Sequence, residues 1–323
     1  MFPSKENLTI CFAHAAYRMK DRFEARKTGI KNFEVRAYDE LQKRLPEADV
    51  LLVSGMWKND LVAHAPKLRF IQSISSGMDQ YSKEQLGAKG VRLASAAGVN
   101  ARAVAEHALS LILALARRLP EARDNQHKKV WRGMIGDLTQ REDELGGKTL
   151  LIVGMGRIGA HLARLAKAFD MKVVGIRRDP AQGPNGADSI HAMGELVKLV
   201  PQADFVALTC ALTPETTGLM SAAAFAAMKP SAYFVNAARG KVADEAALIA
   251  TMRAGKIAGA GLDVTADEPL PEASPLWTMP NVFITPHTAG ETRRYEDNVL
   301  DILMENLGQL WRDEKAKLRN QVL

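Results

Sequence analysis

Apolar residues recur along the chain in short runs that predict strands, and helix-like segments separate most of these runs. The runs form two series. The first predicts strands at 7–13, 33–37, 49–55, 68–74 and 91–95, and helical segments at 61–64 and 79–88. The second predicts strands at 148–154, 172–176, 203–209, 231–237, 257–264 and 281–286. Because strands that alternate with helices form parallel sheets with right-handed crossovers, we assign the chain to the α/β class.

Two longer segments predict helices that set the domain limits. Residues 101–118 are apolar nearly all round, which indicates a deeply buried or interfacial helix that ends before Pro120. Residues 291–317 have the pattern of a long amphipathic helix. We predict two Rossmann-like or flavodoxin-like parallel-sheet domains with a cleft between them. The domains comprise residues 1–98 plus 291–323 and residues 99–290, if the last helix packs back on the first series, which the sequence alone leaves open.

Composition narrows the kinds of partner. The 43 Lys and Arg against 37 Asp and Glu give a net charge of +6, and there is no dense basic block with interleaved aromatic residues. We therefore expect no nucleic-acid or membrane partner, whereas a mild positive field suits an anionic small molecule. No apolar run is long enough to span a bilayer, and MFPSKENLTI does not resemble a secretory signal. With Cys11 and Cys210 as the two cysteines, we expect a reduced, cytoplasmic protein.

The stretch 154-GMGRIG-159 matches the pattern G-x-G-x-x-G directly after an apolar strand and before a predicted helix at 161–169. Gly154 permits a tight turn, Gly156 lets the backbone approach a pyrophosphate, and Gly159 lets the helix pack closely on the strand. Amide groups at the start of that helix then bind the anion. A glycine turn without a ligand is the alternative, but the strand–turn–helix context favours a dinucleotide site.

The next strand, in 173-VVGIRRDP-180, ends in two adjacent arginines. An acid at this place accepts a hydrogen bond from the adenosine ribose of NAD, whereas an arginine accommodates the 2′-phosphate of NADP. Arg177 lies 177 − 154 = 23 residues after Gly154, close to the usual spacing of about 20 residues. Arg177, with Arg178 as a second donor, therefore predicts NADP in preference to NAD. The alternative is that both arginines are solvated and that Asp179 binds the ribose.

Three further motifs follow strands of the second series: 236-NAARG-240, 263-DVTADEPLP-271 and 285-TPHTAG-290. With these motifs, the chain resembles the D-isomer-specific 2-hydroxyacid dehydrogenase family over most of its length. The likeness also covers 75-SSGMDQ-80, 98-GVNARAVAEHALSLILALAR-117, Trp131, 146-GGKTLLIVGMGRIG-159 and 209-TCALTPETTGL-219. The resemblance implies that residues 99–290 bind NAD(P) and that the other domain binds a 2-oxo or 2-hydroxy acid.

Reduction of a 2-oxo acid needs a cation for the carboxylate and a proton donor for the carbonyl oxygen, which gains negative charge. Arg239 suits the first role, because a guanidinium can bind a carboxylate through two hydrogen bonds. His287 suits the second, because histidine exchanges protons near neutral pH, and Glu268 can keep it charged and oriented. The family resemblance implies the same three roles. Each residue alone is more often a surface charge or a cap, but their order and spacing favour catalysis.

The resemblance implies further contacts with substrate and cofactor. Ser76 and Gly77 match a loop whose backbone amides hold the substrate carboxylate, and Asp263 matches the acid that binds the nicotinamide carboxamide. Met56 and Trp57 either reach the substrate side chain or simply pack in the core. The other residues placed along the cofactor by the resemblance are Arg157, Ile158, Cys210, Thr217, Ala237 and Gly290.

The remaining histidines carry no motif. His107, on the long apolar helix, is interpreted as a packed core or interface residue, and the others have no metal-ligand spacing. We therefore predict no metal.

We interpret the chain as an NADPH-preferring reductase that converts a small 2-oxo acid into the D-2-hydroxy acid. Glyoxylate and hydroxypyruvate are the leading substrates, with a bulkier oxo acid such as phenylpyruvate next. As in the family, the helix at 101–118 would form the face of a homodimer. A nucleotide-sensing corepressor of the same fold is the alternative, although the chain has no basic or disordered tail for that role. A formate or phosphoglycerate oxidiser is less favoured because the chain ends soon after its last helix.

Overall fold

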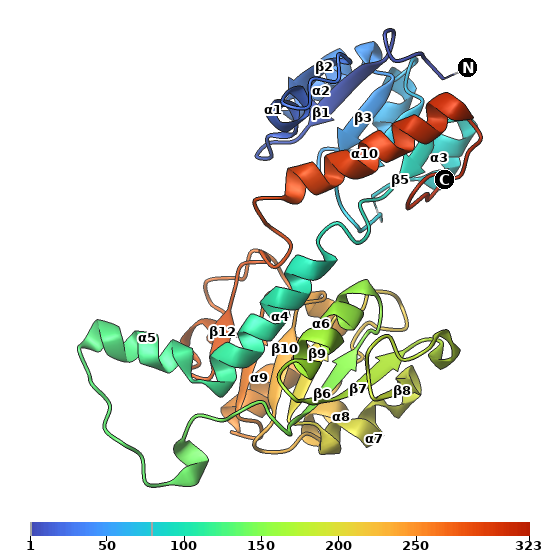
Figure 1. Ribbon diagram of the computed structural model, residues 1–323. Helices are drawn as coiled ribbons and strands as arrows, with labels where there is room; N and C mark the ends of the chain where they lie inside the picture. The colour runs from blue at the N-terminus through green and yellow to red at the C-terminus, as the bar shows by residue number, and fades with distance from the viewer. Residues whose placement is uncertain (1, 79) are drawn as a thin grey trace. The chain divides into compact units, whose positions relative to one another are not determined.

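The computed structural model describes residues 2–78 and 80–323, so Asp79, where one helical segment was predicted to begin, lies outside the described residues. The chain divides into two compact units, which we call unit 1 (Met1–Asn100 with Thr292–Leu323) and unit 2 (Ala101–Glu291). Within the described residues, each unit contains one parallel sheet with helices packed on it (Figure 1). The predicted α/β class is thereby confirmed.

Unit 1 has a sheet of five strands among its described residues, in the flavodoxin-like order 2-1-3-4-5. The strands in sheet order are β2 (Lys31–Val35), β1 (Thr9–Ala13), β3 (Val50–Val53), β4 (Phe70–Ser73) and β5 (Arg92–Ala94). Side chains alternate between two faces, as a period of two requires. Ile10 and Phe12 pack with α1 (Met19–Glu24) and with α10 (Tyr295–Arg312), which returns from the end of the chain. The opposite face packs with α2 (Tyr38–Arg44) and α3 (Lys83–Ala88).

Unit 2 has a sheet of seven strands among its described residues, with the strand order of a Rossmann fold and one added edge strand. In sheet order they are β12 (Val282–Ile284), β11 (Gly259–Leu262), β10 (Tyr233–Asn236), β9 (Phe205–Leu208), β6 (Thr149–Val153), β7 (Lys172–Arg177) and β8 (Ser189–Ala192). One face packs with α4 (Ala101–Ala116) and α6 (Arg157–Lys167). The other packs with α7 (Leu196–Leu199), α8 (Ala222–Ala226) and α9 (Glu245–Arg253).

The register of this second sheet aligns the ends of its strands. The paired row across the sheet is Ile176, Val153, Leu208, Asn236, Leu262 and Ile284. The glycine motif, the paired arginines and the three motifs at 236–240, 263–271 and 285–290 each begin at this row or directly after it. Because all strands are parallel, their carboxyl ends meet at one edge, where open α/β sheets bind ligands. The register therefore places the glycine motif, the arginines and the catalytic candidates along one edge of unit 2.

Several predicted elements differ from the structure. Strand β8 is absent from the predicted strands, because the stretch SIHA has no apolar run and forms a half-buried edge strand. Helix α6 begins at Arg157 rather than at residue 161, since it starts directly after Gly156. Pro120 does not only follow a helix: it lies in the first turn of another, α5 (Leu119–Lys128), where a missing amide hydrogen costs nothing. The segment predicted at 61–64 is a 3-10 helix, Asn59–His64.

The long helix α4 is buried as predicted, with ten of its sixteen residues inside unit 2. No helix in the described part of the chain has both the length and the apolar character needed to cross a membrane.

Candidate active site

The glycine motif forms a tight turn between β6 and α6. Gly154 has a φ of +111°, and its backbone amide donates to the carbonyl oxygen of Ile176 at 2.8 Å. A Cβ atom on Gly154 would lie 2.5 Å from the backbone nitrogen of Cys210, and one on Gly159 would lie 2.3 Å from the carbonyl oxygen of Gly154. Both positions therefore exclude any side chain.

Gly156 differs from its two neighbours in the motif. A Cβ atom there would meet no heavy atom within 4 Å, so the chain itself does not fill this space. Gly156 is also exposed and precedes the first residue of α6. The turn thus fits a pyrophosphate, which needs an open approach to the backbone and to a helix N-terminus.

Strand β7 ends at Arg177, and the chain then turns back on the arginine. The Arg177 guanidinium donates to the carbonyl oxygen of Gly183 at 3.2 Å and to the side chain of Gln182. The Asp179 carboxylate caps the following 3-10 turn, since it accepts from the backbone amide of Ala181 at 3.1 Å and from Gln182 at 3.2 Å. Arg178 is exposed. The acid is thus engaged by its own turn, which disfavours the alternative that Asp179 binds a ribose.

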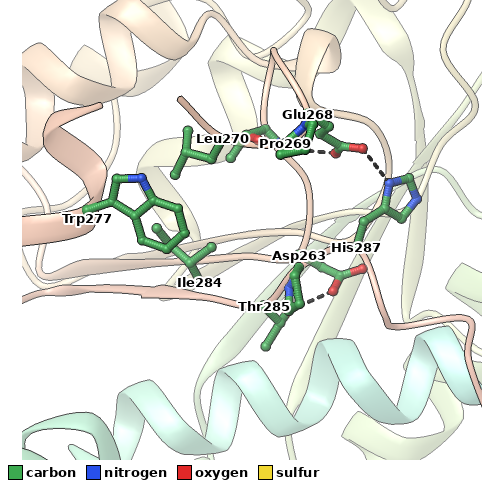
Figure 2. Close-up of a pocket in the computed structure, with 10 residues that line it drawn as sticks. Asp263, Glu268, Pro269, Leu270, Trp277, Ile284, Thr285 and His287 are labelled. Carbon is green, nitrogen blue, oxygen red and sulfur yellow. Dashed lines mark hydrogen bonds and ion pairs between the residues drawn. The ribbon is translucent and has the colours of Figure 1, made fainter. Parts of the chain in front are cut away.

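Glu268 and His287 form an ion pair at the edge of unit 2 (Figure 2). Oε2 of Glu268 lies 2.6 Å from Nδ1 of His287, and Oε1 accepts from the backbone amide of Thr265 at 3.2 Å. His287 has a φ of +56°, which is uncommon for a residue other than glycine. Its backbone amide donates to the carbonyl oxygen of Asp263 at 2.8 Å. Because Nδ1 faces the carboxylate, Nε2 is the ring atom left for a substrate.

Asp263 holds the segment that carries His287. Its carboxylate is 2% exposed. It accepts from the Thr285 hydroxyl at 2.7 Å and from the backbone amides of Thr288 at 3.0 Å and Ala289 at 3.1 Å. The His107 ring joins this group, with Nε2 at 2.8 Å from the Thr285 hydroxyl. No sequence pattern indicates this hydrogen bond, because His107 is half-buried and its partner lies far away in the chain.

Arg239 follows β10 and is exposed, with its guanidinium donating to the carbonyl oxygen of Ala238 at 2.7 Å. The Asn236 side chain fixes this turn, since its amide donates to the carbonyl oxygen of Arg239 at 3.1 Å. Gly240 lies against the next strand connection: a Cβ there would be 1.9 Å from the carbonyl oxygen of Thr265. This close approach brings the Arg239 turn beside the segment that leads to Glu268.

An apolar pocket of about 590 Å³ adjoins the ion pair within unit 2. Figure 2 shows Glu268 and His287 on one side of it, and Trp277 with Leu270 and Ile284 on the other. The Trp277 indole nitrogen donates to the carbonyl oxygen of Pro271 at 3.0 Å, which holds the ring in place. The pocket offers apolar surface beside the His287 ring.

The remaining candidates in unit 2 lie around the same edge. Burial raises the pKa of the Cys210 thiol to about 11, so at neutral pH it is a protonated packing residue beside Gly154. Ala237 is buried, and Gly290 is half-buried. The Thr217 hydroxyl is exposed and donates to the carbonyl oxygen of Thr213 at 2.8 Å.

The candidates in unit 1 lie on the loops after β3 and β4. Ser76 is exposed and Gly77 half-buried, and the Ser75 hydroxyl donates to the carbonyl oxygen of Gly77 at 3.1 Å. Met56 is half-buried. Trp57 is 4% exposed and stacks on Tyr81, which supports the core-packing interpretation of this tryptophan. Among residues 2–78 and 80–323, no group of three metal-ligating side chains is found.

Comparison with known proteins adds an independent line of evidence. Residues 109–289 match the family described as D-isomer specific 2-hydroxyacid dehydrogenase, NAD binding domain. The chain is 38% identical over 293 residues to glyoxylate/hydroxypyruvate reductase B of Escherichia fergusonii, covering 90% of this chain and 89% of the relative. It is 37% identical over 262 residues to D-3-phosphoglycerate dehydrogenase of Mycobacterium bovis. That match covers 80% of this chain and 48% of the relative, so the chain spans about half of its length.

A solved structure gives a similar result. The crystal structure of NADPH-dependent glyoxylate/hydroxypyruvate reductase from Sinorhizobium meliloti, in complex with NADP and malonate, has a TM-score of 0.79 and 26% sequence identity. The match covers 98% of this chain and 97% of that one.

Proposed function

The chain belongs to the D-isomer specific 2-hydroxyacid dehydrogenase family and is an NAD(P)-binding oxidoreductase of 2-oxo and 2-hydroxy acids, and we propose that it reduces glyoxylate or hydroxypyruvate with NADPH. The product is the D-2-hydroxy acid. The observation that carries the proposal is the Glu268–His287 pair, in which Glu268 engages Nδ1 and leaves Nε2 for a substrate. The relatives named as glyoxylate/hydroxypyruvate reductases support the choice of substrate.

The residues divide the chemistry between them. When bound, NADPH supplies the hydride. His287 holds a proton at Nε2 and transfers it to the carbonyl oxygen, while Glu268 accepts from Nδ1 and fixes the ring. Arg239 binds the substrate carboxylate through its guanidinium. Asp263 would hold the nicotinamide carboxamide, and its hydrogen bonds with the backbone amides of Thr288 and Ala289 keep the His287 segment in place.

We assign cofactor binding to unit 2 and substrate binding to unit 1. The family match at residues 109–289 lies within unit 2, which supports the first assignment. In unit 1, the loop of Ser76 and Gly77 would present backbone amides to the carboxylate, with the Ser75 hydroxyl shaping that loop. Met56 would lie near the substrate side chain.

Replacement of Arg177 by aspartate is expected to lower the ratio of kcat/KM with NADPH to that with NADH by about 10- to 150-fold, which corresponds to one charge-assisted hydrogen bond of about 1.5–3 kcal/mol. The aspartate would repel the 2′-phosphate and could accept from the ribose of NADH. Steady-state kinetics with both cofactors measure the ratio.

A matched control for the charge change is Arg253→Asp, at the exposed end of α9. It should leave the cofactor ratio at its wild-type value. Arg178→Ala should shift the ratio in the same direction as Arg177→Asp. An unchanged ratio in Arg177→Asp would mean that the paired arginines are only solvated charges.

The substrate itself needs a panel of acids. A bulkier oxo acid such as phenylpyruvate is the second candidate. Glyoxylate, hydroxypyruvate and phenylpyruvate, each assayed with NADPH and with NADH, separate the candidates by kcat/KM. The relatives named as reductases and dehydrogenases favour catalysis over the corepressor alternative, and a cytoplasmic location remains a prediction from the sequence.

We also propose a homodimer, with the contact on α5 and the segment after it rather than on α4. The outward positions of α4 carry Arg102, Glu106 and Ser110, which are polar. By contrast, Trp131 is 99% exposed and Met134 104% exposed, on a segment that extends away from the sheet of unit 2 (Figure 1). Side chains of this size are costly to leave in water, so a second copy is the partner that we expect to cover them.

The double variant Trp131→Glu with Met134→Glu is expected to convert this dimer into a monomer. Loss of two buried apolar side chains, at about 1.5–3 kcal/mol each, raises the dissociation constant on the order of 100-fold or more. Sedimentation velocity at micromolar concentration measures the state. Val197→Glu, at another exposed apolar position, is the control and should remain dimeric. A monomeric wild-type protein at these concentrations would contradict the proposal.

A further inference from the structure

Helix α4 lies close to β11 because Gly261 has no side chain. A Cβ atom on Gly261 would lie only 3.1 Å from Cβ of Leu111. Asp263 lies two residues beyond Gly261, and His107 lies four residues before Leu111. Two strand residues span about 6.6 Å and four helix residues about 6 Å, so Asp263 and His107 lie at nearly the same distance from the contact between Gly261 and Leu111. The packing at Gly261 therefore places His107 opposite Asp263.

The hydrogen bonds of Thr285 define the proton on His107. The Thr285 hydroxyl has one proton, which it donates to Oδ1 of Asp263 at 2.7 Å. The oxygen of the Thr285 hydroxyl also lies 2.8 Å from Nε2 of His107, and it must accept a hydrogen bond there because its one proton is already donated. His107 is therefore a donor at Nε2, and Nε2 also lies 3.4 Å from Oδ1 of Asp263.

This group holds the backbone on both sides of His287. Thr285 precedes it by two residues, and Thr288 and Ala289, whose amides donate to Asp263, follow it directly. His287 itself is in the left-handed region, a conformation that persists only where the surroundings enforce it. The segment is held from two other elements: Asp263 follows β11, and His107 lies on the helix α4.

We propose that His107 is a positioning residue for the catalytic histidine: through Thr285 and Asp263 it anchors the segment 285–289 to α4 and so fixes the Nε2 atom of His287. The inference rests on the proposed role of His287. A misplacement of about 1 Å at a reacting group can lower the rate on the order of 100-fold. Loss of the His107 donor should therefore lower kcat, and leave binding of NADPH at the glycine turn unchanged.

The test compares variants that remove the donor with variants that keep it. His107→Leu and Thr285→Val are expected to lower kcat about 10- to 100-fold with little change in the Kd for NADPH, measured by fluorescence titration. His107→Gln is expected to keep most of the wild-type kcat, because the side-chain amide nitrogen of glutamine reaches about as far as Nε2 of histidine. Thr285→Ser should do the same, because it keeps the hydroxyl. Thermal unfolding identifies variants that do not fold.

Each outcome tests either the positioning role of His107 or the proposed function. If His107→Leu folds and has wild-type kcat, or if His107→Gln is as impaired as His107→Leu, the positioning role is overturned. A rise in the Kd for NADPH with kcat unchanged also overturns it, since the group would then serve the cofactor alone. If His107→Leu does not fold, the comparison of Thr285→Val with Thr285→Ser decides. If His287→Ala keeps wild-type turnover, the proposed function fails instead.

Discussion

Replacement of His287 by alanine is expected to lower kcat for reduction of a 2-oxo acid by about 10²- to 10⁴-fold, the usual contribution of a positioned general acid. Nδ1 of the ring is engaged by Glu268 at 2.6 Å, so the alanine variant loses Nε2, the ring atom that we propose as the proton donor. The glycine turn lies after β6, whereas His287 follows β12, so the substitution should leave the geometry of the turn unchanged. Binding of NADPH, measured by fluorescence titration, should therefore stay at the wild-type value while steady-state kinetics record the loss.

The matched control is His64→Ala, a histidine on an exposed position of the 3-10 helix Asn59–His64, which should leave kcat unchanged. Glu268→Gln provides a graded comparison, because glutamine keeps an acceptor for Nδ1 but removes the negative charge. Its kcat is expected to lie between those of the wild type and of His287→Ala. Wild-type turnover in His287→Ala would falsify the general-acid role.

Arg239→Ala is expected to lower kcat/KM for every 2-oxo acid on the order of 10²- to 10⁴-fold. The guanidinium can donate two charge-assisted hydrogen bonds to a carboxylate, each of about 1.5–3 kcal/mol. In the structure, the turn that carries Arg239 is fixed by Asn236 and by the approach of Gly240 to Thr265, so the loss should come from the side chain alone. Initial rates over a range of substrate concentration give KM and kcat separately.

Arg239→Lys tests whether the planar guanidinium or only the positive charge matters. We expect it to lower kcat/KM more than the control variant does, since lysine binds as a point charge. The control is Arg253→Ala, which removes an exposed arginine of the same unit. Normal reduction of all tested 2-oxo acids by Arg239→Ala would exclude this arginine from substrate binding.

Much of the fold follows from local patterns. The alternation of apolar runs and helical segments predicts parallel sheets, because a buried parallel strand must be apolar on both faces. This pattern does not predict strand β8, since a half-buried edge strand does not need to be apolar on both faces. Helix α6 starts four residues before the predicted position, because it begins within the glycine motif itself, at Arg157. Local patterns therefore locate central strands well and the edges of elements poorly.

The candidate site also has features that local sequence patterns predict and features that only the tertiary structure shows. The sequence by itself determined which residue types follow which strands: the glycines after β6, the arginines after β7, and His287 after β12. Parallel register then brings these strand ends to one edge, so their proximity needed no further information. Only the tertiary structure decided that Asp179 caps its own turn and that the exposed apolar surface lies after α4. It also decided that His107 reaches Thr285, a hydrogen bond between residues 178 positions apart. That contact depends on how closely α4 approaches β11 at Gly261, and such an approach is set by packing between elements rather than by the pattern within either of them.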